Sequence, residues 1–157
     1  MLLTICTTHA PATDLGFLLH KNPARLHSQD LKFGTAHVFY PEVRDDLCTA
    51  ALLLDIDPIG LVRKKGGEGF ALEQHVNDRP YVASSFLAVA IGQMFRTAMT
   101  GRSKDRQDLA DTALPYRLQM PTLPCHGGET TLRRLFEPLG YAVPAARLQL
   151  DPAFPAW

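Results

Sequence analysis

The chain has 157 residues, of which 46% are hydrophobic and 20% are charged, and its 16 Lys and Arg residues balance 16 Asp and Glu residues. A chain of about 150 residues buries about 70% of its unfolded surface, so one domain with a real core is expected. The zero net charge excludes a bulk electrostatic attraction to RNA or to an anionic membrane surface. Three cysteines are an odd and sparse set, which argues against a disulfide framework and for a reducing, cytoplasmic location.

The first half of the chain predicts short strands and one short helix. Thr13 or Asp14 is expected to cap the helix, which runs through Leu18 and ends before Pro23. Pro41 is expected to close the second strand. Apolar runs rich in β-formers define the strands, although residues 47–56 also fit a short helix and residues 25–33 are ambiguous. The predicted strands are 2–8, 34–40, 47–56 and 70–76, with an exposed loop at 63–69.

The apolar stretch 81–101 is the part around which the rest is expected to fold. Pro80 suits a helix start, and Gly101 suits a helix stop. Apolar residues occupy one helical face and the neighbouring faces as well, so we expect a central helix at about 81–100 that is buried on several sides. Two serines, a glutamine and Arg96 interrupt the apolar run, which excludes a membrane span.

The second half alternates helices with strands. Pro121 indicates that its first strand lies at an edge or leaves the sheet. The expected elements are a surface helix at 103–113 capped by Ser103, a strand at 116–123, an amphipathic helix at 129–139 and a last strand at 141–150.

This order of elements predicts an α+β fold in which helices pack on a mixed β-sheet. We expect one domain over residues 1–150. The Pro-rich tail at 151–157 is expected to begin a linker or a further subdomain of a longer protein.

The loop Cys125-His126-Gly127-Gly128-Glu129 is the sharpest local candidate for chemistry. Free N–H groups at a helix start hold anions, and a Cys there has a lowered pKa. Glu129, however, would itself complement the helix dipole and repel an anion, so we favour a Gly-rich connection into a capped helix. The six histidines lack metal-binding spacing, and no catalytic residue or metal ligand is predicted. A small hydrolase that uses Cys125 with one of the histidines remains as a third hypothesis.

Four stretches, in chain order, carry a family resemblance. They are THAPATDLGFLLHKNP (8–23), FGTAHVFYPE (33–42), GGEGFALEQHVNDRPYVASSFLAVAI (66–91) and LPCHGGETTLRRLFEPLGYAV (123–143). Together they resemble the start of the bacterial Hen-type 3′-terminal RNA ribose 2′-O-methyltransferases of RNA repair. The likeness runs over nearly the whole chain.

The resemblance implies a division of labour. The full-length protein would add a C-terminal domain that methylates the 3′-terminal ribose 2′-hydroxyl of RNA with S-adenosylmethionine and a divalent metal. Its partner would be a polynucleotide kinase–phosphatase–ligase, and the N-terminal region would dock on the ligase and activate it. Because this chain has no Gly-rich methyl-donor loop after a strand and no Glu/His metal cluster, the resemblance implies a non-catalytic segment without a cofactor of its own.

Polar residues in loops near these stretches are the candidate contacts. The predicted contacts with the ligase are Lys21, Arg79, Arg102, His126 and Glu129. The alternative is an RNA-contacting module, whose basic side chains would converge on one face. Its candidate residues are Arg63, Lys64, Lys65, Arg133 and Arg134, with Arg102, Lys104 and Arg106.

Overall fold

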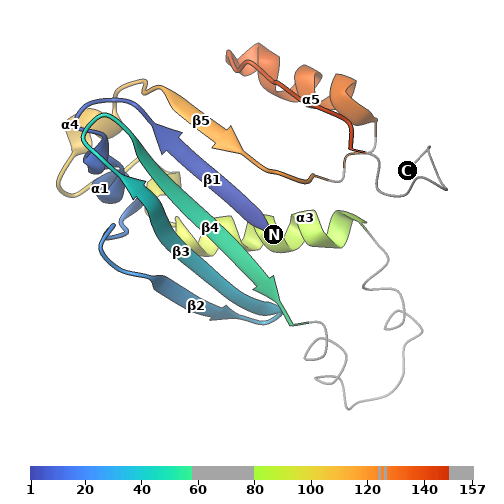
Figure 1. Ribbon diagram of the computed structural model, residues 1–157, viewed down its shortest axis with the longest axis horizontal. Helices are drawn as coiled ribbons and strands as arrows, with labels where there is room; N and C mark the ends of the chain where they lie inside the picture. The colour runs from blue at the N-terminus through green and yellow to red at the C-terminus, as the bar shows by residue number, and fades with distance from the viewer. Residues whose placement is uncertain (58–79, 124, 126, 149–157) are drawn as a thin grey trace. The chain divides into compact units, whose positions relative to one another are not determined.

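The computed structural model describes residues 1–57, 80–123, 125 and 127–148 (Figure 1). Contacts within the chain divide it into unit 1, Met1–Thr122, and unit 2, Leu123–Trp157, and each is described by itself. The expected single domain over residues 1–150 stays a prediction, and the tail at 151–157 lies outside the described residues. The elements of unit 1 are β1 (Leu2–Thr7), η1 (Ala12–Asp14), α1 (Leu15–Leu19), β2 (His27–Leu31), β3 (Gly34–Val43), β4 (Cys48–Ile56), α3 (Pro80–Met94), η3 (Ala98–Thr100), α4 (Gln107–Ala110) and β5 (Tyr116–Gln119).

Unit 1 is built on a five-stranded sheet in the order β2-β3-β4-β1-β5 (Figure 1). Each pair of neighbouring strands among the described residues is antiparallel. The α+β class is therefore confirmed, but the sheet is antiparallel rather than mixed. Short connections explain the difference, because β2, β3 and β4 follow one another through turns that are too short for a parallel crossover.

The β4 strand lies in the middle of the sheet, and its alternation resolves the choice between strand and helix at 47–56. Cys48, Ala50, Leu52 and Leu54 are buried on one face, whereas on the other face Leu53 is exposed and only the small Ala51 is buried. This period of two is the signature of a strand with one face on the core. Predicted strands 2–8 and 34–40 are likewise confirmed as β1 and β3.

Two strand predictions change in extent. The ambiguous stretch 25–33 contains β2, which pairs with β3. The expected strand end at Pro41 is wrong, because β3 continues to Val43. The pairing of β3 with β4 shifts its register between Phe39 and Glu42. An irregular register places Pro41 where the ladder needs no N–H donor. The predicted strand 70–76 and loop 63–69 lie outside the described residues.

The α3 helix packs one face onto the sheet. Leu87, Ala90 and Met94 are buried, but Val89 on the opposite side is 44% exposed. The burial on several sides that we expected is therefore not confirmed, because the sheet covers one face only. Gly101, with φ of 68°, ends the short η3 segment rather than α3. No helix among the described residues has the length and hydrophobicity needed to cross a membrane.

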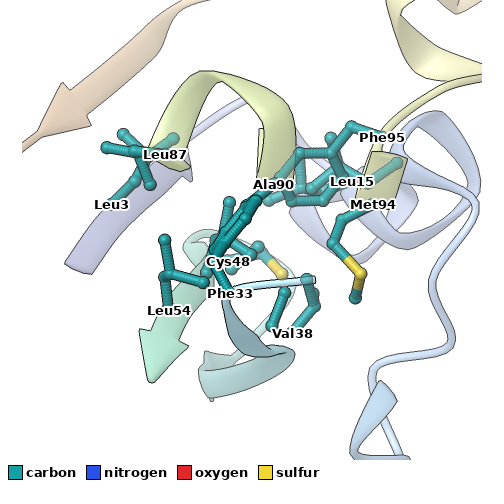
Figure 2. Packing of buried hydrophobic residues seen from close by; sticks show 14 of the residues in the cluster. Leu3, Leu15, Phe33, Val38, Cys48, Leu54, Leu87, Ala90, Met94 and Phe95 are labelled. Atoms are coloured by element: carbon teal, nitrogen blue, oxygen red, sulfur yellow. The ribbon is translucent and has the colours of Figure 1, made fainter. Parts of the chain in front are cut away.

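The core of unit 1 joins α1, α3 and the sheet face beneath them. Figure 2 shows Leu15 of α1 close to Ala90 and Phe95, above residues of β3 and β4. Phe33 and Phe86 stack with ring centroids 4.3 Å apart. These contacts hold α1 and α3 on the same side of the sheet.

Unit 1 ends in a helix shorter than predicted and an edge strand. The expected helix at 103–113 is reduced to α4, and Ser103 lies four residues before its first residue. The predicted strand at 116–123 is confirmed as the shorter β5, which pairs with β1.

Unit 2 contains α5 (Gly128–Phe136) and η4 (Glu137–Leu139), so the predicted amphipathic helix at 129–139 is confirmed. Its start needs Gly127, which has φ of 90° and where an added Cβ would clash with Thr131 Oγ1. The predicted strand at 141–150 is wrong over its described residues, 141–148, which form no strand. A strand is stabilised by ladder hydrogen bonds to a neighbouring strand, and no described residue of unit 2 belongs to one.

Candidate protein-docking surfaces

The structure brings two predicted contact residues, Lys21 and Arg102, to one corner of unit 1. His20 lies between them at the end of α1, with φ of 53°, and its Nε2 is 2.9 Å from the carbonyl oxygen of Arg102. A carbonyl only accepts, so Nε2 carries the hydrogen. Tyr40 donates a 3.0 Å hydrogen bond to the carbonyl of Lys21, and partial burial lowers the pKa of the Lys21 ammonium. Arg102 is exposed, so this corner presents two basic side chains.

A buried polar cluster, which sequence reasoning missed, holds that corner together. The Ser103 hydroxyl is buried, donates to the carbonyl of Phe17 at 3.3 Å and accepts from the backbone N–H of Arg106 at 3.3 Å. Arg106 Nε donates to Asp14 Oδ2 at 2.9 Å, and its guanidinium lies 5.3 Å from the centroid of the Phe17 ring. A buried carboxylate needs such a partner. Asp14 and Arg106 are 92 positions apart in the chain, so no local sequence pattern predicts their pairing.

The helix caps consequently differ from those expected. Neither Thr13 nor Asp14 makes a side-chain capping bond at the start of α1 or of the preceding η1. The Asp14 carboxylate is engaged with Arg106 instead. Ser103 does accept from a backbone N–H three residues on, but the helix that follows begins at Gln107.

The remaining predicted contact residues are spread over the chain. Arg79, His126 and the basic run 63–65 lie outside the described residues. Glu129 is on α5, where it accepts from Arg133 Nε at 2.8 Å. The contact roles proposed for these residues stay predictions.

Part of the basic set for RNA is already paired with carboxylates. Arg133 bonds both Glu129 and Glu137, and Arg106 bonds Asp14. These contacts lower the positive charge that the two arginines offer to a phosphate. Arg134 and Lys104 are exposed, and the RNA-contacting role stays a prediction without an observation that favours it.

The apolar face of α5 is the second feature that sequence reasoning missed. The sequence marks the helix as amphipathic but does not tell whether another element covers its apolar face. In the structure most of these side chains are exposed, and the rings of Phe136 and Tyr141 meet edge to face with centroids 6.4 Å apart. We call this set the α5 stripe: Leu132, Leu135, Phe136, Leu139 and Tyr141.

No arrangement for catalysis emerges in the described part of the chain. No group of three His, Cys, Asp or Glu side chains is placed there to hold a metal ion. Burial, with the nearby Cys6 and Glu42, raises the pKa of the Cys48 thiol to about 11. The Cys125 sulfur lies 3.5 Å from the carbonyl oxygen of Gly128. The hydrolase hypothesis stays a prediction, since His126 is outside the described residues.

A hollow of about 360 Å³ lies beside β2 and α3. Its lining residues are Gln29, Gly92, Gln93 and Arg96. The Gln29 amide donates to the Gln93 side-chain oxygen at 2.9 Å, so these two residues mainly connect β2 to α3. None of the four is a nucleophile or a general base at neutral pH.

The comparison with protein families decides the identity of the region. A family model described as "RNA repair, ligase-Pnkp-associating, region of Hen1" matches residues 1–157, the whole chain. The chain belongs to this family. The resemblance found in the sequence is thereby confirmed, and with it the link of this Hen1 region to RNA repair and to association with the Pnkp ligase. No curated protein matches the chain.

Proposed function

We propose that this Hen1 region docks on the ligase of a polynucleotide kinase–phosphatase–ligase and activates it, in the bacterial cytoplasm. The match of the whole chain to a ligase-associating region is the observation that carries the proposal. A methyltransferase domain in the full-length protein then methylates the 3′-terminal ribose 2′-hydroxyl of RNA, with S-adenosylmethionine and a divalent metal. This region contributes contact rather than chemistry.

Activation by contact has a defined energetic requirement. A bound protein shifts a conformational equilibrium of the ligase only by its difference in affinity for the two states. Each tenfold shift toward the reactive state requires about 1.4 kcal/mol of that difference. The Hen1 region therefore has to contact parts of the ligase that change between the states. Its predicted contacts, Lys21, Arg79, Arg102, His126 and Glu129, are proposed to supply polar interactions at the rim of the interface.

Adenylation of the ligase tests this function. The isolated ligase is incubated with radiolabelled ATP, with and without an equimolar amount of the chain, and the covalent ligase–adenylate is quantified over time. We expect the chain to raise the rate or the extent of adenylation and to reach saturation near equal concentrations. An unrelated protein of similar size serves as the control. Unchanged adenylation, together with no detectable binding of the two proteins, would contradict the proposal.

A further inference from the structure

We infer that the α5 stripe is the apolar anchor by which this region docks, and that it inserts into an apolar groove of the ligase. The inference rests on the proposed function and names the surface that performs it. It extends the five predicted polar contacts, because only Glu129 among them belongs to α5.

The spacing of the stripe fits recognition of a helix by a groove. Leu132, Leu135 and Phe136 stand at positions i, i+3 and i+4, which places them on one side of α5, and Leu139 follows in η4. This is the pattern with which amphipathic helices anchor in grooves of partner proteins. Tyr141 continues the patch through its contact with the Phe136 ring.

The stripe is also exposed over most of its residues. Leu135 is 58% exposed and Leu139 is 71% exposed, and Phe136 and Tyr141 are exposed as well. Single exposed apolar residues are ordinary on protein surfaces, whereas contiguous ones mark interaction sites. Unit 1 also exposes apolar side chains, which are distributed over α1, the sheet, α3, η3 and the loops, with Tyr116, Leu118 and Met120 in a row at β5.

The charges beside the stripe indicate which partner fits. Arg133 is held between Glu129 and Glu137, and with the exposed Arg134 the side chains of α5 and η4 carry two negative and two positive charges. A helix without net positive charge offers little attraction to RNA phosphate or anionic lipid. It fits an apolar groove of a protein. The family match extends over α5 and names a ligase-associating region, which identifies that protein as the ligase.

Binding of the ligase to matched variants tests the inference. Affinity is measured by isothermal titration calorimetry with the full chain, in wild-type form and as the double variant Leu135→Ala/Leu139→Ala. The matched control is Leu26→Ala/Met99→Ala, which truncates two residues of unit 1 that are 64% and 69% exposed. We expect the α5 variant to weaken the dissociation constant by at least about tenfold, and the control to change it by less than about twofold. Circular dichroism before titration verifies that each variant keeps its helix content.

The possible results distinguish a failure of the inference from a failure of the proposed docking function. If the wild-type chain binds the ligase and the α5 variant binds equally well, the stripe is not the anchor, although the docking function stands. If the chain alone forms a dimer that the α5 variant dissociates, a second copy covers the stripe and the inference is wrong. If the wild-type chain does not bind the ligase, both the inference and the proposed function fail.

Discussion

The two units of the molecule use the same apolar residue types for opposite purposes. In unit 1, Leu52 is 1% exposed on the central strand, and α1 and α3 cover the sheet face that carries it. In unit 2, no described residue is buried, and Leu139 stands largely in solvent. Unit 1 stabilises its own fold by burial, whereas unit 2 exposes apolar side chains that the proposed docking would cover.

The units also differ in what holds their local structure. An isolated helix of nine residues is marginal in water. The α5 helix depends on local devices, namely the left-handed start at Gly127 and the ion pairs of Arg133 with Glu129 and Glu137. Exposed pairs of this kind each contribute only a few tenths of a kcal/mol. Unit 2 should therefore open more readily than the sheet of unit 1.

The largest expected contrast comes from truncating one leucine in each unit. Leu52→Ala removes a fully buried side chain and should lower the free energy of unfolding by about 2–5 kcal/mol. Leu135→Ala removes an exposed side chain and should change it by less than about 0.5 kcal/mol. Urea denaturation followed by circular dichroism measures both. A similar loss in the two variants would show that α5 contributes to a shared core, and the comparison would be wrong.

Thiol chemistry gives the next largest contrast. The thiolate is the reactive form, and raising the pKa of Cys48 from its ordinary 9.0 to about 11 lowers the thiolate fraction at pH 8 about a hundredfold. Because the pKa of Cys48 is higher in the folded than in the unfolded chain, folding suppresses the reactive thiolate fully below about pH 9. This suppression is lost as the pH rises through 11. Cys48 should therefore react with iodoacetamide only on unfolding, whereas the half-buried Cys125 of unit 2 should react in the native chain. Mass spectrometry of alkylated peptides gives the rates, and rapid native labelling of Cys48 would contradict the assignment.

A smaller effect is expected at the buried polar cluster of unit 1. Ser103→Ala leaves the Phe17 carbonyl without its side-chain donor and the N–H of Arg106 without its acceptor. An unsatisfied group of this kind costs about 1–2 kcal/mol of stability. Ser28→Ala is the control, because the hydrogen bond of this exposed serine with His37 Nδ1 can be replaced by water, and it should cost less than about 0.5 kcal/mol. Equal effects in urea denaturation would mean that the cluster does not hold the corner of α1.

The smallest expected effects come from two glycines with opposite signs. Gly127→Ala places a Cβ against Thr131 at positive φ and should destabilise α5 by about 1 kcal/mol. Gly92→Ala, in a helical position with open space around it, should stabilise α3 by about 0.5–1 kcal/mol. Amide exchange resolved by peptide reads the two helices separately. Faster exchange in α3, or none of the expected acceleration in α5, would contradict the geometry of these positions.

Much of the fold was accessible from sequence patterns. Short apolar runs rich in β-formers marked β1 and β3, and the spacing of Leu132, Leu135 and Phe136 marked α5. Patterns of neighbouring residues report on local structure, and they do so well when an element is covered on one face. The expected burial of α3 on several sides was an overestimate, because small apolar residues such as Ala88 face solvent as readily as they face a core.

The site was less accessible than the fold. The pairing of Asp14 with Arg106 joins distant parts of the chain, and no local pattern encodes it. An amphipathic pattern predicts that a helix has an apolar face, but not what covers that face, which left the role of the α5 stripe undetermined. Docking on a ligase followed only from the family resemblance, since no single residue of the chain encodes its partner.

Hydrogen–deuterium exchange of the chain with and without saturating ligase shows whether α5 contacts the ligase. We expect the amides of α5 to exchange at least about tenfold more slowly in the complex, while the amides of β4, already protected by the sheet, keep their rates. Protection confined to unit 1, or no change in either unit at a ligase concentration that saturates binding, would contradict it.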